Sequence, residues 1–466
     1  LTRRMRGQFN GRMAFESVKA AVELDDFDEG IAAERANFQQ CLEHEQRAAM
    51  IHVFFSERQA AKIPDVPAST PKREIATAAT VGAGLMGGGI AMSFADAGIP
   101  VRVLEVDDDA LQKGLGTIET NYARMVKSGR ISQAEMDDRM GRITGVLDYD
   151  AIKDADVVIE AVFENLDLKK EIFETLDATM KPGAVLASNT SGLDLDQMAA
   201  ATSRPEHVVG MHFFSPANIM QLLEVVRGQK TDKETLATAM ALGKTIGKIP
   251  VMATNAPGFI GNRMRGGYTS PAGEIILQGA LPEQVDKVIY DFGFNMGPFA
   301  MNDLVGLDLG WRARNMAGVE PDDRPLTTVV PDKLCDMGRY GQKTGAGFYR
   351  YEEGSRQGRP DPEVTKLIEE TSKERGIERR EIGDEEVLKR CLYPLINIGC
   401  DLLEAGIAQK PSDIDVVYVY GYGFPKYRGG PMYYADQVGL ESIYRDSLAF
   451  QNEYGDAWRP SVLLKR

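Results

Sequence analysis

Five short apolar segments alternate with helical segments between about residue 75 and residue 254, and this alternation limits the fold more than any other feature. The segments are IATAATVGAG, VRVLEV, DVVIEAV, AVLASNT and HVVGMHFF. Strands separated by helices are typical of βαβ units, which place the strands in a parallel sheet covered by helices on both faces. The sequence therefore predicts an α/β fold with a doubly wound sheet.

The regions on either side of this alternation are predicted to be helical. Residues 1–63 place Arg, Glu, Gln and Ala around apolar positions, and the Pro-rich stretch IPDVPASTPKR follows as a linker. Beyond Asn255, LPEQVDKVIYDFGFNMGPFAMNDLVGL (281–307) resembles KPSDIDVVYVYGYGFPKYRGGPMYYADQVGL (410–440). Two copies of one helical unit predict a duplication with mutual packing. The charged stretch 352–386 is interpreted as a connector plus the start of the second unit's first helix.

Composition excludes several classes of protein. A chain of 466 residues is too long for one core, which predicts roughly two to four domains. The net charge of −15 argues against a nucleic-acid partner, and no apolar run has membrane-spanning length. Four scattered cysteines and four histidines argue against a metal site and for a reducing compartment. Because the chain begins at Leu1 without a signal peptide, we expect a processed chain or one lacking its true start.

A Gly-rich turn follows the first predicted strand and opens a helix. In GAGLMGG, Gly82 suits a tight turn, Gly84 lets a pyrophosphate approach the backbone, and Gly87 permits close packing of helix on strand. The helix N-terminus would face the phosphates. The next strand ends at Glu105, whose carboxylate can bind both ribose hydroxyls and would repel a 2′-phosphate. The sequence thus predicts NAD rather than NADP, against the alternative of a structural turn without a ligand.

His212 and Glu224 are the candidate catalytic pair. A dehydrogenase that acts on an alcohol needs a base that titrates near neutral pH, and histidine supplies one. His212 lies late in the strand series, SPAN turns the chain, and MQLLEVV is interpreted as a returning strand that can bring Glu224 beside it. A buried carboxylate there would orient the ring and stabilise the imidazolium. The alternative is a core histidine with a strand-edge glutamate.

Other polar residues fit the same site. ASNTSG follows another strand, so Asn189, Thr190 and Ser191 are expected at a carboxyl-terminal edge of the sheet. NAPGFIGNR places Asn262 where the sheet gives way to helices. Such residues also serve as caps and turn formers, and the residues alone leave both interpretations open.

Seven motifs form a combination far more specific than the Gly-rich turn alone. They are VGAGLMGGGIA, VIEAVFENLDLKKEIF, ASNTSGLDLDQMA, GMHFFSPANIMQLLEVV, NAPGFIGNRM, GFNMGPFAMNDLVGLD and GQKTGAGFYRY. Together they resemble the L-3-hydroxyacyl-CoA dehydrogenase family over about residues 72 to 460. The helical repeats, CLYPLIN and GYGFPKYRGGPMYYAD are similar to the multifunctional β-oxidation enzymes, in which an enoyl-CoA hydratase module precedes the dehydrogenase. Residues 1–63 resemble the linker helix that ends that module, and the hydratase's catalytic glutamates have no counterpart, so we expect no hydratase activity in this chain.

The resemblance implies a fold and an order of domains. It implies an NAD-binding Rossmann-type doubly wound sheet, followed by an all-α duplicated C-terminal dehydrogenase domain and preceded by a helical linker. The expected ranges are 1–70 for the linker as a remnant of the hydratase/isomerase module, 71–253 for the Rossmann domain, 254–351 for the first helical domain, and 352–466 for the connector and second helical repeat.

The resemblance also implies roles for individual residues. His212 would be the base and Glu224 its partner, and no metal is expected. Ser191 and Asn262 would bind and position the 3-hydroxyl or thioester region of the substrate. The residues expected to hold the cofactor are Gly82, Gly84, Leu85, Met86, Gly87, Glu105, Ala161, Glu164, Lys169, Asn189, Ser215 and Lys343.

The implied function is NAD-dependent oxidation of (S)-3-hydroxyacyl-CoA to 3-oxoacyl-CoA in fatty acid β-oxidation. The alternatives are a portion of a bifunctional hydratase/dehydrogenase that is inactive without its missing domain, a related dehydrogenase for hydroxy acids without CoA, and a non-catalytic assembly subunit. The expected partners are an acyl-CoA thioester as substrate and a thiolase or β-oxidation complex, with the chain as a monomer or homodimer. The chain ends in LLKR without a peroxisomal address, so we expect a bacterial-type cytoplasmic setting.

Overall fold

The computed structural model describes residues 5–316, 318–320, 323–355 and 357–466. The described chain forms two compact units. The sheet unit comprises residues 51–263 and 402–422, and the helical unit comprises the described residues of 1–50, 264–401 and 423–466. The chain therefore leaves the sheet unit and returns to it once through a segment of the second helical repeat.

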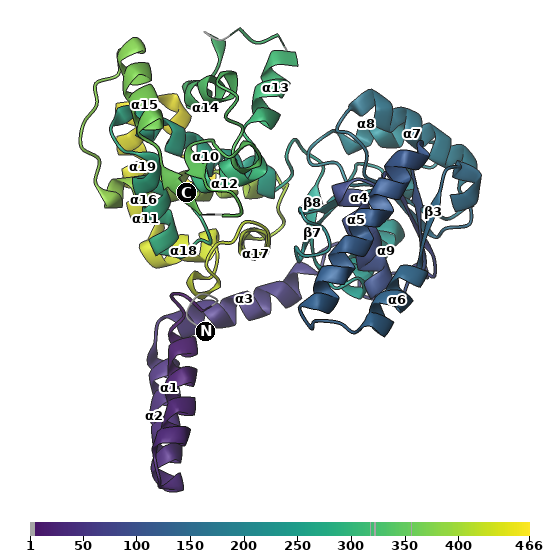
Figure 1. The fold of residues 1–466 in the computed structure, drawn as a ribbon, viewed down its shortest axis with the longest axis horizontal. Coiled ribbons are helices and arrows are strands. Elements are labelled where there is room, and N and C mark those ends of the chain that lie inside the picture. The colour runs from purple at the N-terminus through teal and green to yellow at the C-terminus, as the bar shows by residue number, and fades with distance from the viewer. Residues whose placement is uncertain (1–4, 317, 321–322, 356) are drawn as a thin grey trace. The chain divides into compact units, whose positions relative to one another are not determined.

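An eight-stranded sheet with the order β3-β2-β1-β4-β5-β6-β7-β8 forms the centre of the sheet unit (Figure 1). Its strands are β1 (Ala78–Val81), β2 (Val101–Leu104), β3 (Ile143–Val146), β4 (Val157–Glu160), β5 (Val185–Ser188), β6 (Val208–Phe213), β7 (Leu222–Arg227) and β8 (Ile249–Thr254). Strands β1 to β6 pair in parallel, whereas β7 is antiparallel to β6 and parallel to β8. The predicted doubly wound sheet is confirmed, and the returning strand is β7.

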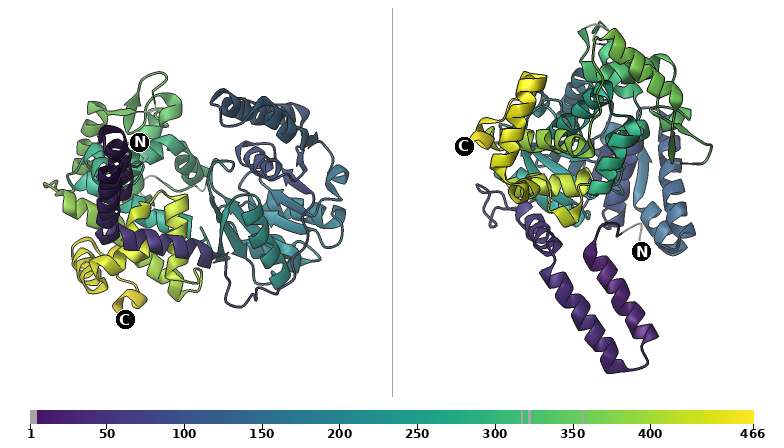
Figure 2. Two further views of the ribbon diagram at one scale, coloured as in Figure 1. Left: turned by 90° about the horizontal axis from the view of Figure 1, so that it is seen from below. Right: turned by 90° about the vertical axis from the view of Figure 1, so that its left-hand side faces the viewer.

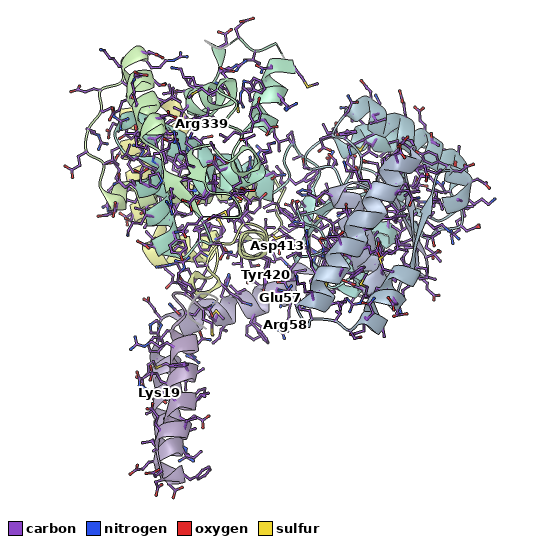
Figure 3. All side chains as sticks on the ribbon, in the orientation of Figure 1. Lys19, Glu57, Arg58, Arg339, Asp413 and Tyr420 are labelled. Carbon is purple, nitrogen blue, oxygen red and sulfur yellow. The ribbon has the colours of Figure 1, made fainter. Side chains whose placement is uncertain are left out.

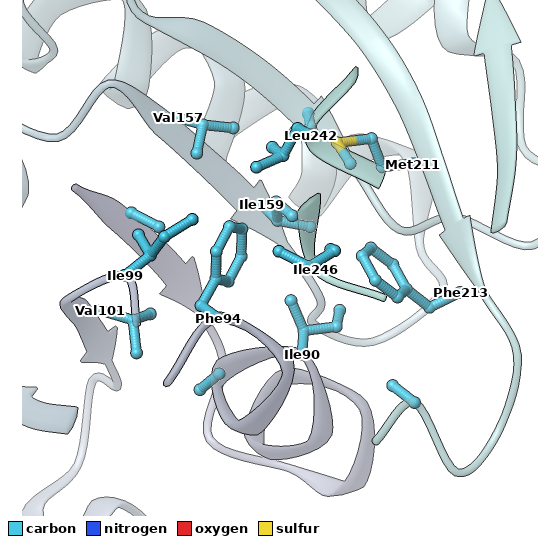
Figure 4. Close-up of a cluster of buried hydrophobic side chains, with 14 of the residues drawn as sticks. Ile90, Phe94, Ile99, Val101, Val157, Ile159, Met211, Phe213, Leu242 and Ile246 are labelled. Atoms are coloured by element: carbon cyan, nitrogen blue, oxygen red, sulfur yellow. The ribbon is translucent and has the colours of Figure 1, made fainter. Parts of the chain in front are cut away.

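The helices of the sheet unit cover both faces of the sheet. Helices α4 (Leu85–Asp96), α5 (Asp108–Lys127), α6 (Gln133–Gly141) and α9 (Lys233–Thr245) share one apolar core with alternate strand residues. Phe94 of α4 and Ile159 and Phe213 of the strands belong to it (Figure 4). The intervening residues, such as Val158 and Leu186, are equally buried outside this core. Because successive strand residues point to opposite faces, they belong to the other face, where α7 (Leu166–Thr179) and α8 (Leu195–Ala200) contact β5 and β6.

Two segments distant in sequence complete the sheet unit. They are most of α3 (Gln46–Ala60) and the segment that carries α17 (Pro411–Gly421), and α17 contacts β7 and β8. The Thr254 amide donates to the Ile407 carbonyl at 3.0 Å. Tyr420 donates its hydroxyl hydrogen to Glu57 at 2.7 Å (Figure 3). Polar contacts thus hold α17 to the linker helix.

Within 1–63, expected to be helical, the described residues form three α-helices rather than one continuous run. Helices α1 (Phe9–Glu23) and α2 (Phe27–Glu43) run side by side (Figure 2), and α3 follows. The chain breaks before α2 because Asp26 is its N-cap and accepts the amides of Asp28 and Glu29 at 2.7 and 3.1 Å.

The remaining helices belong to the helical region that follows the sheet. They are α10 (Gly261–Gln278), α11 (Pro282–Phe292), α12 (Pro298–Val305), α13 (Asp308–Met316), α14 (Leu326–Asp336), α15 (Pro362–Glu374), α16 (Asp384–Glu404), α18 (Pro431–Val438), α19 (Leu440–Tyr454) and α20 (Val462–Lys465). A short hairpin of β9 (Tyr349–Tyr351) and β10 (Gly358–Pro360), which the sequence did not predict, departs from the expected all-α character. The stretch 352–386 contains a full helix of its own, α15, before α16 begins.

The two sequence repeats share a backbone conformation. Each contains two helices, α11 and α12 in the first copy and α17 and α18 in the second. Gly306 ends α12 with φ 104° and ψ 122°, and Gly439 ends α18 with φ 94° and ψ 119°. Glycine adopts a positive φ at little energetic cost, whereas residues with a Cβ are strained there. The closing Val-Gly-Leu of each copy therefore makes the same turn, as a duplication predicts.

Within the part of the chain that the structure describes, no helix combines the length and the apolar character needed to cross a membrane.

Candidate active site

His212 on β6 and Glu224 on β7 are direct cross-strand partners. Residues paired in this way carry their side chains on the same face of the sheet at short distance. The His212 Nδ1 and Glu224 Oε2 atoms are 2.7 Å apart, and the two side chains are 7% and 0% exposed. A carboxylate can only accept, so Nδ1 carries the hydrogen and Nε2 keeps its lone pair for a proton. Twelve residues of sequence separation thus become a buried contact.

The second oxygen of Glu224 is held at the start of α10. Glu224 Oε1 accepts the amides of Ile260 and Gly261 at 3.1 and 3.0 Å. The preceding Phe259 has φ 48°, a strained value for a bulky residue that costs about 1–3 kcal/mol. This turn aims two amides at the carboxylate, and it sets the Phe259 ring 5.7 Å from the His212 ring. With both oxygens engaged, the carboxylate has one orientation.

Asn262 and Ser191 come together beside this pair. Asn262 Nδ2 donates to the Ser191 carbonyl at 3.1 Å. The Ser191 hydroxyl donates to Glu164 at 2.9 Å, and the Thr190 hydroxyl donates to the same Glu164 oxygen at 2.8 Å. Although burial opposes the effect, the Lys169 ammonium and these hydrogen bonds hold the pKa of Glu164 below its usual range. Glu164 therefore stays ionised and fixes the loop that carries Ser191.

Lys169 and Asn189 use their polar atoms within the protein. The Lys169 side chain is 1% exposed, and its ammonium lies 2.6 Å from Glu160 Oε1 and 3.4 Å from Glu164 Oε2. Asn189 Oδ1 accepts the Phe213 amide at 2.8 Å, which ties the end of β5 to β6. Contact of either side chain with the cofactor stays a prediction.

Sequence reasoning missed Glu160, which is fully buried at the end of β4. It accepts the Ser188 hydroxyl hydrogen at 2.7 Å and the Val162 amide at 2.8 Å, besides pairing with Lys169. An acid inside an apolar strand, nine residues before a lysine on the following helix, was the available signal.

The Gly-rich turn leaves room for a ligand at one position only. A Cβ at Gly82, where φ is 103°, would lie 2.8 Å from the Ala161 carbonyl oxygen, and a Cβ at Gly87 would lie 1.9 Å from the Gly82 carbonyl oxygen. At Gly84, the N-cap of α4, a Cβ would meet nothing within 4 Å. Protein packing therefore explains two of the glycines, and open space at a helix N-terminus fits the pyrophosphate of a dinucleotide.

The other predicted cofactor residues surround this turn or lie apart from it. Glu105 Oε2 accepts the Ala83 amide at 3.0 Å and so buttresses the turn. Leu85 is exposed, whereas Met86 and Ala161 are half-buried against the core. Ser215 is exposed in the loop between β6 and β7. Lys343 belongs to the helical unit, where its ammonium binds Asp308, and its predicted contact with the cofactor stays a prediction.

Tyr422 is a second residue that sequence reasoning missed. It follows α17 in the second repeat, and its hydroxyl donates to Asn262 Oδ1 at 2.8 Å. The signal lay in the repeat, because Phe292-Gly293-Phe294 of the first copy corresponds to Tyr422-Gly423-Phe424 of the second. The second copy carries a hydroxyl where the first carries a phenylalanine.

A doubly wound sheet with a dinucleotide turn and a buried histidine at the same edge defines the class of NAD-dependent dehydrogenases. Comparison with known families makes this specific. The model of the 3-hydroxyacyl-CoA dehydrogenase NAD binding domain matches residues 77–256, and that of the 3-hydroxyacyl-CoA dehydrogenase C-terminal domain matches residues 258–351 and 387–466. The chain belongs to the 3-hydroxyacyl-CoA dehydrogenase family.

Individual relatives agree with this assignment. A peroxisomal bifunctional enzyme of Danio rerio is 41% identical over 486 residues, covering 100% of this chain and 66% of the relative. The 3-hydroxybutyryl-CoA dehydrogenase of Escherichia coli superposes with a TM-score of 0.72 at 27% identity, covering 84% of this chain and 98% of that one. The dehydrogenase part of multifunctional enzyme 1 from C. elegans gives 0.68 at 29% identity, covering 89% and 96%. The chain spans about two thirds of the length of the Danio rerio relative.

The expected bacterial-type cytoplasmic setting is wrong. The Danio rerio relative is named a peroxisomal enzyme, as are other similar proteins from animals and plants. The expectation failed because it rested on the last residues of the chain, and a short address is not a property of the fold.

Proposed function

We propose that the chain oxidises the 3-hydroxyl of an (S)-3-hydroxyacyl-CoA, with His212 as the base and Glu224 as its partner. The observation that carries the proposal is the buried 2.7 Å contact between His212 Nδ1 and Glu224 Oε2 at the sheet edge that also carries the Gly-rich turn. Membership of the 3-hydroxyacyl-CoA dehydrogenase family supports the substrate class.

In this proposal the chain's own residues move and hold a proton. His212 Nε2 takes the proton of the 3-hydroxyl, and the Glu224 carboxylate stabilises the imidazolium that results. Phe214 and Phe259, whose rings lie 4.6 and 5.7 Å from the His212 ring, keep water from the pair and so strengthen its electrostatic attraction. Asn262 and Ser191 orient the substrate's oxygen atoms.

The residues at and around the Gly-rich turn are suited to binding NAD. When bound, NAD⁺ supplies the acceptor for the hydride. Gly84 and the N-terminus of α4 would hold its pyrophosphate, and Glu105 would hold a ribose. Glu164, Lys169, Asn189 and Ser215 would shape the rest of the site, directly or through the contacts described above.

The test follows NADH absorbance with acetoacetyl-CoA as substrate. We expect turnover in the wild type, loss of turnover in His212→Ala, and a fall of about 10²-fold or more in Glu224→Gln with NADH affinity within twofold of wild type. His207→Ala, five residues before His212, is the matched control and should keep its activity. An unchanged rate in Glu224→Gln would remove the pair from the mechanism, and NADH binding without turnover in the wild type would favour a non-catalytic subunit.

The organisation of the chain is proposed on the same basis. We infer a linker at 1–70, a Rossmann domain at 71–253, a first helical domain at 254–351, and a connector with the second helical repeat at 352–466. Because the two helical repeats can pack on each other within one chain, we propose that the chain functions as a monomer. Light scattering would distinguish a monomer from a homodimer, since one chain has a mass of 51.2 kDa. The product is a 3-oxoacyl-CoA, so a thiolase is the partner proposed.

A further inference from the structure

Tyr422 and Asn262 form a contact between two distant parts of the sequence. The Tyr422 hydroxyl lies 2.8 Å from Asn262 Oδ1, although 160 residues separate them. Both residues belong to the sheet unit. Asn262 makes a second hydrogen bond, in which its Nδ2 donates to the Ser191 carbonyl at 3.1 Å. The chain Tyr422, Asn262, Ser191 thus runs from the second helical repeat to the carboxyl edge of the sheet.

The end of α17 is packed against β7, the strand that carries Glu224. A Cβ at Gly421 would lie 2.5 Å from Leu222 Cδ2, so the end of α17 lies directly against the Leu222 side chain of β7. The Tyr422 ring meets the Phe214 ring edge-on at 5.6 Å and stacks on the Tyr418 ring at 4.9 Å. Phe214 in turn lies 4.6 Å from the His212 ring. These ring contacts hold the Tyr422 side chain in place in addition to its hydrogen bond with Asn262.

The Ser191 carbonyl and the Tyr422 hydroxyl together hold the Asn262 amide in one orientation. An asparagine side chain offers one acceptor and one donor group, and the two ends are nearly equal in shape. The Ser191 carbonyl can only accept, so it takes the amide NH₂, and the Asn262 oxygen then faces the Tyr422 hydroxyl, which donates to it. Without the Tyr422 hydroxyl, the amide would lose one of its two partners and could rotate.

We propose that Tyr422, supplied by the second helical repeat, is a positioning residue that acts through Asn262 to orient the substrate. This inference rests on the proposed function, because Asn262 orients substrate only if the chain binds an acyl-CoA. It gives the second repeat a direct part in the site. The first repeat has Phe292 at the corresponding position and cannot supply this hydrogen bond.

The test compares Tyr422→Phe with Tyr420→Phe. Each substitution removes one hydroxyl, and that of Tyr420 binds Glu57 at 2.7 Å instead of a site residue. We measure turnover of acetoacetyl-CoA with NADH, and calorimetric binding of acetoacetyl-CoA in the presence of NAD⁺, which cannot react because both are oxidised. The expected result for Tyr422→Phe is a 3- to 10-fold loss of kcat/KM and of acetoacetyl-CoA affinity, about the effect of one hydrogen bond, with the NADH Kd within twofold. Tyr420→Phe should match the wild type in all three.

A double variant separates positioning from general destabilisation. In an Asn262→Ala background, Tyr422→Phe should cause no further loss, because the residue it acts through is absent. Tyr422→Phe within twofold of wild type, or an equal loss in the Asn262→Ala background, would overturn the inference. A wild-type chain that binds no acetoacetyl-CoA would overturn the proposed function, and this inference with it. If the wild type turns over substrate, His212→Ala loses that activity and Tyr422→Phe keeps it, the inference about Tyr422 is overturned and the proposed function stands.

Discussion

Gly84 and Gly87 lie in the same turn, but a methyl group added at each would meet different surroundings. Gly87→Ala would place Cβ 1.9 Å from a carbonyl oxygen, so we expect the free energy of unfolding to fall by about 1–3 kcal/mol. Gly84→Ala meets no protein atom within 4 Å and should leave the melting temperature unchanged while weakening NADH binding at least about 10-fold. Thermal unfolding and NADH fluorescence titration check the pair. Full NADH affinity in Gly84→Ala would show that the pyrophosphate does not lie there.

Lys169 and Glu160 form an ion pair with side chains 1% and 0% exposed. Lys169→Met would leave the Glu160 carboxylate buried without its cation, which costs about 3–5 kcal/mol of unfolding free energy. The neighbouring Lys170→Met removes a lysine whose side chain is 38% exposed and should change stability by less than about 0.5 kcal/mol. Urea unfolding at pH 7 measures both. Equal effects of the two substitutions would contradict a structural role for the buried pair.

The loop between β6 and β7 is held by Lys248, which immediately precedes β8. The Lys248 ammonium donates to the Ala217 and Met220 carbonyls, and burial lowers the pKa of Lys248 to about 8. We expect Lys248→Met to raise amide hydrogen exchange in residues 214–221 at least about 10-fold, since hydrogen bonds from a charged group are among the stronger ones. Because this loop joins His212 to Glu224, kcat should fall as well. Lys244→Met, on the exposed end of α9, is the control and should leave exchange in the loop unchanged.

Two carboxyl groups of the first helical repeat have raised pKa values. Burial raises the pKa of Asp286 and of Asp303 to about 6, although each accepts backbone amides and a tyrosine hydroxyl hydrogen. A pKa above the unfolded value means that the folded state holds more protons between about pH 4 and pH 6, so the stability these groups contribute is lost as the pH rises through this window. Asp303→Asn should flatten that part of the stability curve, measured by urea unfolding at pH 4.5 and pH 7. Asp291→Asn, exposed on α11, should leave the curve as it is.

At the scale of the whole molecule, the second repeat is divided between the two units. Helix α17 belongs to the sheet unit and α18 to the helical unit. His52 of α3 lies 2.8 Å from Asp415 of α17, whose side chain is 1% exposed. His52→Ala removes this partner from a buried carboxylate, and we expect the free energy of unfolding to fall by about 1–3 kcal/mol. Urea unfolding measures the change, and an unchanged free energy of unfolding in His52→Ala would contradict a structural role for this contact.

Local patterns in the sequence were enough to predict the class of fold, the Gly-rich turn and the strand that carries Glu224. The βαβ alternation predicted the doubly wound sheet, because burial on both faces demands continuous apolar strands. The Gly-rich turn and the returning strand with Glu224 were predictable for the same reason, since each depends on neighbours within about thirty residues. The repeat was visible because duplicated turns keep their glycines, as Gly306 and Gly439 show.

Only the tertiary structure decided which distant polar groups meet. Tyr422 looks like one aromatic residue in a repeat until its hydroxyl is seen to contact Asn262. The physical reason is that a hydrogen bond depends on positions within tenths of an ångström, whereas sequence periodicity reports only which face of an element is buried. Contacts across 160 residues arise from the packing of whole elements, and no local pattern encodes them.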